Sequence, residues 1–278
     1  MSAEFPLRPL TVGEVLDAGA AVLRRRPLVL LVAAVLAAGE RAVLHQWSGL
    51  DPQAHSLDGF IHRFGAYWAL FAAGMGTEAF IIGILGGFTA PAAVAMVTSG
   101  GVRLRSRWLS IVVTSALIGA VAAGAFFAGG VGWVAWFMLT SLAIPTLAVD
   151  GGVADPRGRL RNPVALFGRA VKLASRGLLG GRVRLLGYLP WQLVRLLLLS
   201  VGGGEAVAKL LSITSDAAVT TIDWTLWIAL NALCYATIAG GDAAAHLETR
   251  IRTEGLDIAV SRAVRTGSPV EPVLAVPR

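Results

Sequence analysis

Charged residues are scarce in this sequence, and cysteine is nearly missing. Only 15% of the 278 residues are Asp, Glu, Lys or Arg, whereas a soluble globular domain carries about 25%. The one cysteine, Cys234, cannot form an internal disulfide, which excludes a small secreted disulfide-bonded scaffold. With 55% hydrophobic residues and a mean hydropathy of +0.69, the composition also excludes a disordered chain and indicates a polytopic membrane protein.

Catalytic and metal-binding motifs are missing as well. The sequence has no GxxxxGK[ST] phosphate loop, no HExxH pair, no GxSxG elbow and no CxxC pair, which are patterns of nucleotide, zinc, hydrolase and redox chemistry. Its four histidines fit no spacing typical of metal ligands. We therefore expect a protein that is not an enzyme and that uses no metal and no cofactor.

The sequence is rich in apolar segments long enough to cross a bilayer. Crossing about 30 Å of hydrocarbon takes about 20 helical residues, and only helices satisfy their own backbone in lipid. The second segment is too long for one plain crossing, so residues 66–77 could span the membrane or lie on its surface. The predicted fold class is an all-α polytopic membrane helix bundle of about six transmembrane helices, at 28–47, 66–99, 108–128, 131–149, 183–201 and 223–244.

Two amphipathic helices are expected beside these spans, at 11–26 and 162–177. Thr11 and Glu14 form the capping-box pattern that starts a helix. Asn162 followed by Pro163 is typical of a helix start as well. Residues 1–265 are expected to form a single integral membrane domain. The proline-containing tail, 266–278, is expected to be a disordered cytoplasmic segment.

The basic residues predict how the chain threads the membrane. Lys and Arg concentrate on the cytoplasmic side of membrane proteins. With six spans and a cytoplasmic N-terminus, 20 of the 24 basic residues fall on one side, the exceptions being Arg41, Arg63, Arg195 and Lys209. We therefore expect a multi-pass protein of the cell membrane with both termini in the cytoplasm.

Some charged residues fall inside the predicted spans, and burying a charge in lipid costs about 2.5 kcal/mol or more. Glu40 and Arg41 lie in the first span, Glu78 in the second and Arg195 in the fifth. One interpretation pairs Arg195 with Glu78 or Glu40 between packed helices. The other makes these residues the lining of a polar path for a substrate or a proton.

A second group of charges lies between the fourth and fifth predicted spans. Cations on an amphipathic segment bind an anionic inner leaflet at about 1 kcal/mol each. They could be a topology signal alone, or they could bind lipid headgroups or the acidic surface of a protein partner. Nucleic acid is not an expected partner, because no aromatic platform accompanies the charge. The candidate lipid- or partner-binding residues are Arg169, Lys172, Arg176, Arg182 and Arg184.

Three segments also carry a family resemblance: residues 7–17 (LRPLTVGEVLD), 165–187 and 250–257 (RIRTEGLD). They are similar to the opening, middle and closing motifs of uncharacterised actinobacterial membrane proteins. Those proteins are related to the membrane domain that accompanies some glycerophosphodiester phosphodiesterases. The resemblance covers residues 7 to about 260 and implies a membrane fold with a link to lipid or envelope biology. The middle motif of the family reads Arg-Ser-Trp where this chain has Arg169-Ala-Val-Lys172, and the catalytic domain is not expected here, so hydrolysis is not implied.

These observations lead to two functional hypotheses. The first is a non-enzymatic accessory or scaffold protein that contacts anionic lipid and a partner at the cytoplasmic face. The alternative is a transporter, or the membrane subunit of one, in which Glu40, Glu78 and Arg195 line a path. A transporter requires water to reach those three residues, whereas a scaffold requires them to be sealed by packing.

Overall fold

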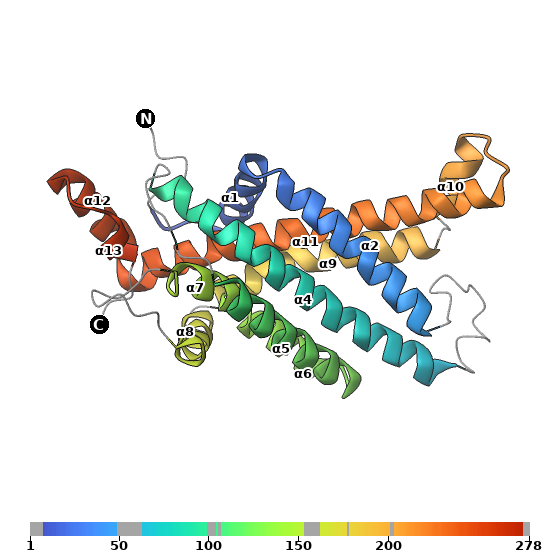
Figure 1. Cartoon of the computed structure of the whole chain (residues 1–278), viewed down its shortest axis with the longest axis horizontal. Coiled ribbons are helices and arrows are strands. Elements are labelled where there is room, and N and C mark those ends of the chain that lie inside the picture. The colour runs from blue at the N-terminus through green and yellow to red at the C-terminus, as the bar shows by residue number, and fades with distance from the viewer. Residues whose placement is uncertain are drawn as a thin grey trace.

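The computed structural model describes residues 8–48, 63–98, 104, 107–152, 162–176, 178–200 and 203–274. Every regular element in these ranges is a helix, which confirms the all-α fold class. Long helices run roughly along one axis of the molecule, with α12 and α13 at one end and α10 at the other (Figure 1). The helices are α1 (Val12–Arg25), α2 (Leu28–Ser48), α4 (Phe64–Val97), α5 (Trp108–Phe127), α6 (Val131–Leu139), α7 (Ala143–Val149), α8 (Pro163–Ser175), α9 (Leu179–Ser200), α10 (Gly203–Leu210), α11 (Asp216–Glu254), α12 (Leu256–Thr266) and α13 (Glu271–Leu274).

Five helical segments in the described ranges are long and apolar enough to cross a membrane. They are Leu28–Trp47, Phe64–Val97, Trp108–Phe127, Val131–Val149 and a stretch within Asp216–Glu254. They agree with five of the six predicted spans.

The remaining predicted span, 183–201, coincides with α9, which is not among those five segments. Arginines at positions 182, 184 and 195 lower the hydropathy of α9. The helix is nevertheless 22 residues long and packs along α11. Five of its leucines are exposed, whereas Arg184 and Tyr188 are buried. Beyond the exposed Arg182, the polar residues of α9 therefore lie mainly on its inner side, and its outer side is apolar; the exposed leucines are Leu186, Leu189, Leu193, Leu196 and Leu197.

The long second segment is one continuous helix. Residues 66–77 belong to α4 and form neither a separate surface element nor a separate span. The helix also continues through Gly86, Gly87 and Pro91, although proline and glycine often interrupt helices. Glycines let α5 approach closely, since a Cβ atom at Gly76 would lie 2.8 Å from the Cβ of Ala123. Gly76 thus allows the close helix–helix contact that small residues favour in membranes.

The fourth predicted span is interrupted. A turn at residues 140–142 separates α6 from α7. The interruption is buried, with Thr140, Ser141 and Leu142 each at most 1% exposed. Irregular backbone is tolerated at membrane depth only where protein surrounds it, and this turn meets that condition.

The two predicted amphipathic helices are present and begin as expected. Thr11 caps α1, and the reciprocal bonds between Thr11 and Glu14 complete a capping box. Asn162 accepts a hydrogen bond from the backbone N–H of Val164 and caps α8. Gly177, the expected end of the second helix, lies outside the described residues. Helix α1 packs on α11, with Gly19 against the backbone of Gly240 and Gly241.

The prediction of disorder beyond residue 265 is wrong for residues 266–274. Helix α12 ends at Thr266, and α13 follows it over Glu271–Leu274. The Leu274 side chain is fully buried, and its carbonyl oxygen accepts a hydrogen bond from Arg250. Residues 275–278 lie outside the described part of the chain.

Candidate functional site: charges inside the helix bundle

The charged residues of the predicted spans meet inside the bundle. Arg195 Nη1 of α9 lies 2.6 Å from Glu78 Oε1 of α4 in an ion pair. Tyr188 donates its hydroxyl to the other oxygen of the same carboxylate, and Gln192 Nε2 lies 3.4 Å from that oxygen. Glu78 is 2% exposed. The predicted pairing of Arg195 with a glutamate is thus confirmed, with Glu78 as the partner.

Glu40 lies near this pair but has a different environment. Tyr235 donates its hydroxyl to Glu40 Oε2 at 2.6 Å, and Thr77 donates to the other oxygen. Among the described residues, no lysine or arginine forms an ion pair with Glu40. Two carboxylates therefore share the neighbourhood of one guanidinium, and that guanidinium is bonded to Glu78.

Arg41 pairs with an acid in the N-terminal half of α11. Its Nη2 atom lies 2.7 Å from Asp223 Oδ2. The guanidinium carbon also lies 4.9 Å from the ring centre of Trp224 and 5.3 Å from that of Trp227. Arg195 lies 4.8 Å from the same Trp227 ring. Trp227 thus contacts both arginines, in the geometry of a cation–π interaction.

Arg184 corrects part of the sequence prediction. It was expected to bind lipid or a partner, but it is 5% exposed and lies inside the bundle. Its guanidinium forms a two-pronged pair with the buried Asp242 of α11. Arg184 Nη1 also donates to the carbonyl oxygen of Phe137 at 2.9 Å, and lies 3.4 Å from the Thr140 hydroxyl. The arginine therefore satisfies polar groups that the interruption between α6 and α7 leaves at the end of α6.

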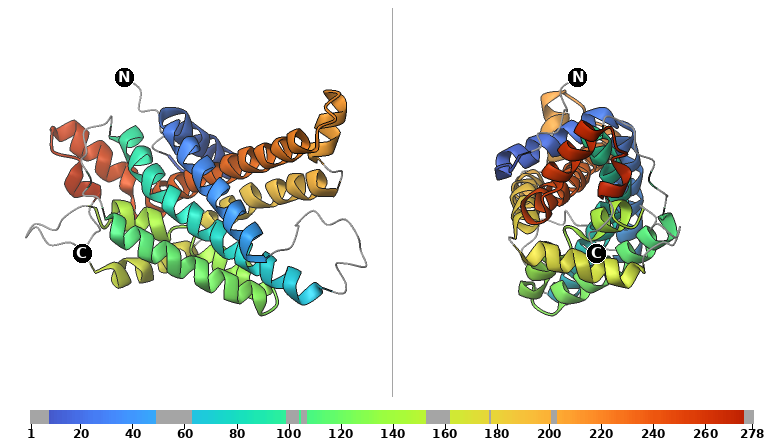
Figure 2. Two further views of the ribbon diagram at one scale, coloured as in Figure 1. Left: turned by 45° about the vertical axis from the view of Figure 1, so that its right-hand side comes forward. Right: turned by 90° about the vertical axis from the view of Figure 1, so that its left-hand side faces the viewer.

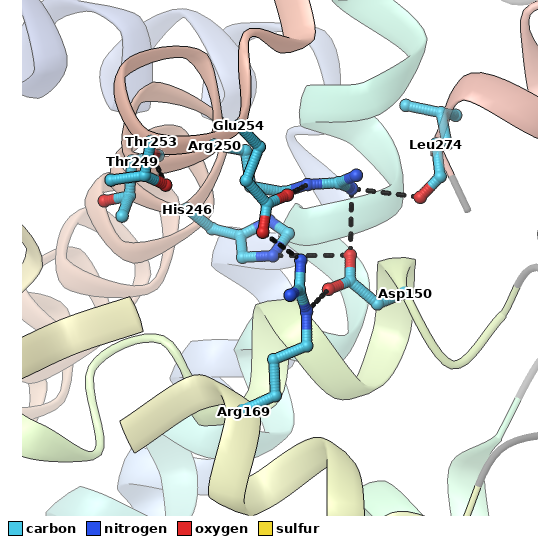
Figure 3. Close-up of polar contacts among 8 residues, drawn as sticks. All are labelled: Asp150, Arg169, His246, Thr249, Arg250, Thr253, Glu254 and Leu274. Carbon is cyan, nitrogen blue, oxygen red and sulfur yellow. Dashed lines mark hydrogen bonds and ion pairs between the residues drawn. The ribbon is translucent and has the colours of Figure 1, made fainter. Parts of the chain in front are cut away.

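Arg169 is corrected in the same way, because its guanidinium is held by two carboxylates (Figure 3). Its Nε atom lies 2.9 Å from Asp150 Oδ2, and its Nη2 atom pairs with Glu254. Arg250 bridges the same two acids and donates to the carbonyl oxygen of Leu274 (Figure 3). This network joins α7, α8, α11 and α13 at one end of the bundle.

Asp150 is the centre of this network. Burial alone would raise the pKa of its carboxyl group, but the nearby His246, Arg250 and Arg169 outweigh burial and hold the pKa well below its usual range. His246 Nε2 lies 3.6 Å from Asp150 Oδ1, which is longer than a hydrogen bond. Asp150 is therefore ionised across the physiological range and serves as the common partner of both arginines.

The three remaining candidates for lipid or partner binding are on the surface. Lys172, Arg176 and Arg182 are exposed, the first in α8, the second at its C-terminal cap and the third in α9. Helix α8 buries its other side through Leu166, Ala170, Leu173 and Ala174. We name Lys172, Arg176 and Arg182 the basic corner, because they follow one another where α8 ends and α9 begins.

The structure also brings together the three segments that carry the family resemblance. Glu248 accepts a hydrogen bond from the backbone N–H of Leu10 at 2.9 Å, and Arg252 donates to the carbonyl oxygen of Leu10. Arg169 of the middle segment pairs with Glu254 of the closing one. The opening, middle and closing segments therefore converge on the C-terminal part of α11.

Sequence reasoning missed three acidic partners: Asp150, Asp223 and Asp242. Asp242 falls inside the predicted span 223–244, so the cost of an acid in lipid could have identified it as it identified Glu78. The arrangement as a whole matches charges to one another. Within the described ranges, no group of three or more His, Cys, Asp or Glu residues could hold a metal ion.

Comparisons with protein families, curated proteins and solved structures give no match to this chain.

Proposed function

We propose that this chain is a non-enzymatic accessory or scaffold protein of the cell membrane. In this proposal it contacts anionic lipid and a protein partner from its cytoplasmic face. One observation carries the proposal: Arg195, Arg184 and Arg169 are paired with carboxylates within the fold, whereas the basic corner is left exposed. The bundle's own charges thus stabilise its helices, and the exposed cations are available to other molecules.

The proposed topology has six crossings with α9 as the fifth. The apolar outer side of α9 supports this, since its arginines at 184 and 195 are paired inside the bundle. Helices α8, α12 and α13 lie toward one end of the bundle and α10 toward the other, in both Figure 1 and the left view of Figure 2. Because the basic corner lies at the former end, the positive-inside rule favours that end as the cytoplasmic one.

The resemblance to membrane domains that accompany glycerophosphodiester phosphodiesterases fits a role at the lipid surface. We propose that the convergence of the three similar segments holds α8 in place beside the inner leaflet. Hydrolysis is no part of the proposal.

Lipid binding can be tested on the purified full chain in nanodiscs. The variant Lys172→Gln/Arg176→Gln/Arg182→Gln removes the basic corner. At about 1 kcal/mol per cation, we expect up to about a 100-fold loss in the preference for phosphatidylglycerol over phosphatidylcholine, read by native mass spectrometry of retained lipids. The matched control is Arg24→Gln/Arg262→Gln/Arg265→Gln, which removes three exposed cations elsewhere. An equal loss in the control would show that net charge, and not the basic corner, attracts lipid.

The protein partner requires a separate test. Chemical crosslinking in native membranes, followed by purification and mass spectrometry, should recover a partner crosslinked near Lys172. Recovery of phospholipid alone would contradict the scaffold role.

The transporter alternative keeps one observation in its favour, the lack of a cationic partner for Glu40 among the described residues. A transporter would carry protons or solute across proteoliposomes and would lose that flux in Glu40→Gln. The scaffold proposal expects no flux in either protein.

A further inference from the structure

Glu40 and Glu78 lie close together but are bonded by different kinds of group. Glu78 is held by the guanidinium of Arg195, which has only donors to offer. Glu40 is held by the hydroxyls of Thr77 and Tyr235, which can donate or accept. The guanidinium favours the ionised carboxylate of Glu78, to which Tyr188 also donates, whereas the two hydroxyls around Glu40 admit both the carboxylate and the neutral acid.

An ionised Glu40 would be poorly compensated. Its side chain lies within the bundle, and moving a carboxylate out of water without a counter-ion is costly. The groups that face it are Glu78 from α4, Arg195 from α9, and Tyr235 and Cys234 from α11. The charges of Glu78 and Arg195 cancel, and Arg41, the next residue along α2, is paired with Asp223. The net charge of the cluster is therefore the charge of Glu40.

We propose that Glu40 is an exchangeable proton-binding site inside the bundle, occupied at neutral pH. In the occupied state the acid donates its proton to one hydroxyl and accepts from the other. On release, the O–H bond of the carboxylic acid breaks, the proton passes to water, and both hydroxyls turn to donate to the carboxylate. The heavy atoms need not move, because each hydroxyl hydrogen rotates to suit.

Glu40 is less deeply enclosed than Glu78, although it lies well inside a candidate span. It is the thirteenth of 21 residues in α2, which places it about 18 Å along the helix from Leu28 at a rise of about 1.5 Å per residue. Glu40 is 9% exposed, compared with 2% for Glu78. Glu40 is therefore less completely enclosed by the protein than the glutamate in the ion pair. This inference goes beyond the proposed scaffold role and does not depend on it.

Infrared spectroscopy of the full chain in nanodiscs tests the site, because a protonated carboxyl group has a carbonyl stretch that an ionised one lacks. We expect wild type at pH 7 to show a protonated-carboxyl band that Glu40→Gln abolishes and that alkaline pH removes. Tyr235→Phe should shift this band, because it deletes one of the two hydrogen bonds to Glu40. If Glu40 were ionised at pH 7, neither this band nor its shift in Tyr235→Phe would be seen.

Further measurements test whether the band comes from Glu40 and whether the exchanged ion is a proton. Tyr188→Phe, next to the ion pair, should keep the band, because it leaves the charges of Glu78 and Arg195 unchanged. Glu78→Gln should weaken the band, because the guanidinium of Arg195 then has no carboxylate but Glu40 beside it and favours its ionised form. A spectrum of Glu40→Gln identical to that of wild type would overturn the proposal. A band that Tyr235→Phe leaves unshifted, or that added Na⁺ or K⁺ removes at constant pH, would overturn it too.

Discussion

The two halves of α11 meet different surroundings. From residue 231 to 251 almost every residue is buried, whereas from 216 to 230 most are partly or fully exposed. In the first of these stretches Asp242 pairs with Arg184 of α9, and in the second Asp223 pairs with Arg41 of α2. The side chains of Asp242 and Arg184 in the inner pair are 3% and 6% exposed, and those of Asp223 and Arg41 in the outer pair are 18% and 12%. An Asp–Arg ion pair thus lies inside the bundle in one half of α11 and at the edge of the bundle in the other half.

The largest effect is expected when the inner pair is broken. Asp242→Asn leaves Arg184 buried without its counter-charge, and removing one partner of a buried pair costs about 3–5 kcal/mol. Unfolding of the purified protein in mixed micelles, followed by circular dichroism, measures the free energy. The double variant Arg184→Leu/Asp242→Leu removes both charges and should recover most of the loss. A double variant no more stable than Asp242→Asn would show that the pair also holds the end of α6 in place.

The next largest loss of stability is expected when a methyl group is added where α1 contacts α11. A Cβ atom at Gly19 would lie 2.7 Å from the backbone nitrogen of Gly241, so Gly19→Ala forces the helices apart at about 1–3 kcal/mol. Gly13→Ala, in the same helix, meets open space and should be neutral or slightly stabilising, because alanine favours a helix. The same unfolding measurement compares them. Equal effects would mean that α1 does not depend on close contact with α11.

Breaking the outer pair should cost less. In Asp223→Asn, Arg41 keeps its contacts with the rings of Trp224 and Trp227 and has partial access to solvent. We expect a loss of about 1 kcal/mol in unfolding free energy, near the upper range for exposed pairs. A loss as large as that of Asp242→Asn would erase the distinction between the two halves of α11.

The smallest effect is expected at the exposed start of α1. The hydrogen bond and charge of Arg8, together with the bonds from Thr11, lower the pKa of Glu14 from 4.5 to about 2. Because the folded-state pKa is depressed, the stabilisation from Glu14 is fully present above pH 4.5 and is lost as the pH falls toward 2. Melting temperatures of wild type and Glu14→Gln should therefore differ slightly at pH 7 and converge near pH 2. A difference that persists at pH 2 would show that ionisation of Glu14 is not its source.

Hydropathy and capping patterns were sufficient to predict most of the fold. Local sequence predicts five spans, the start of α1 and the start of α8. The length of an apolar segment determines a span, and the capping residues determine where a helix starts. Local sequence does not predict that residues 271–274 are ordered, because their placement depends on the hydrogen bond that Arg250 donates to Leu274. A proline-containing tail has the same composition whether or not another helix binds it.

The candidate site was predictable only in part, for a similar reason. Glu78 and Arg195 were identified because a charge in lipid requires a partner. Arg184 was assigned to the surface because it lies near the end of a span. The local sequence there does not distinguish an arginine that contacts a lipid headgroup from one that pairs with a buried carboxylate. Its partner Asp242 is 58 residues away, and sequence does not specify how two helices are rotated about their axes.

The length of α11 has a consequence for what the C-terminal helices can touch. If the membrane ends near residue 244, as the predicted span has it, the remaining residues to Glu254 rise about 15 Å beyond the hydrocarbon. The headgroup layer takes up about 6 Å of that distance, so α12 begins roughly one Debye length, about 8 Å, above the lipid phosphates. The field of an anionic leaflet is largely screened there. In that geometry the side chains of α12 lie beyond most of the leaflet's electrostatic influence, whatever the lipid composition below them.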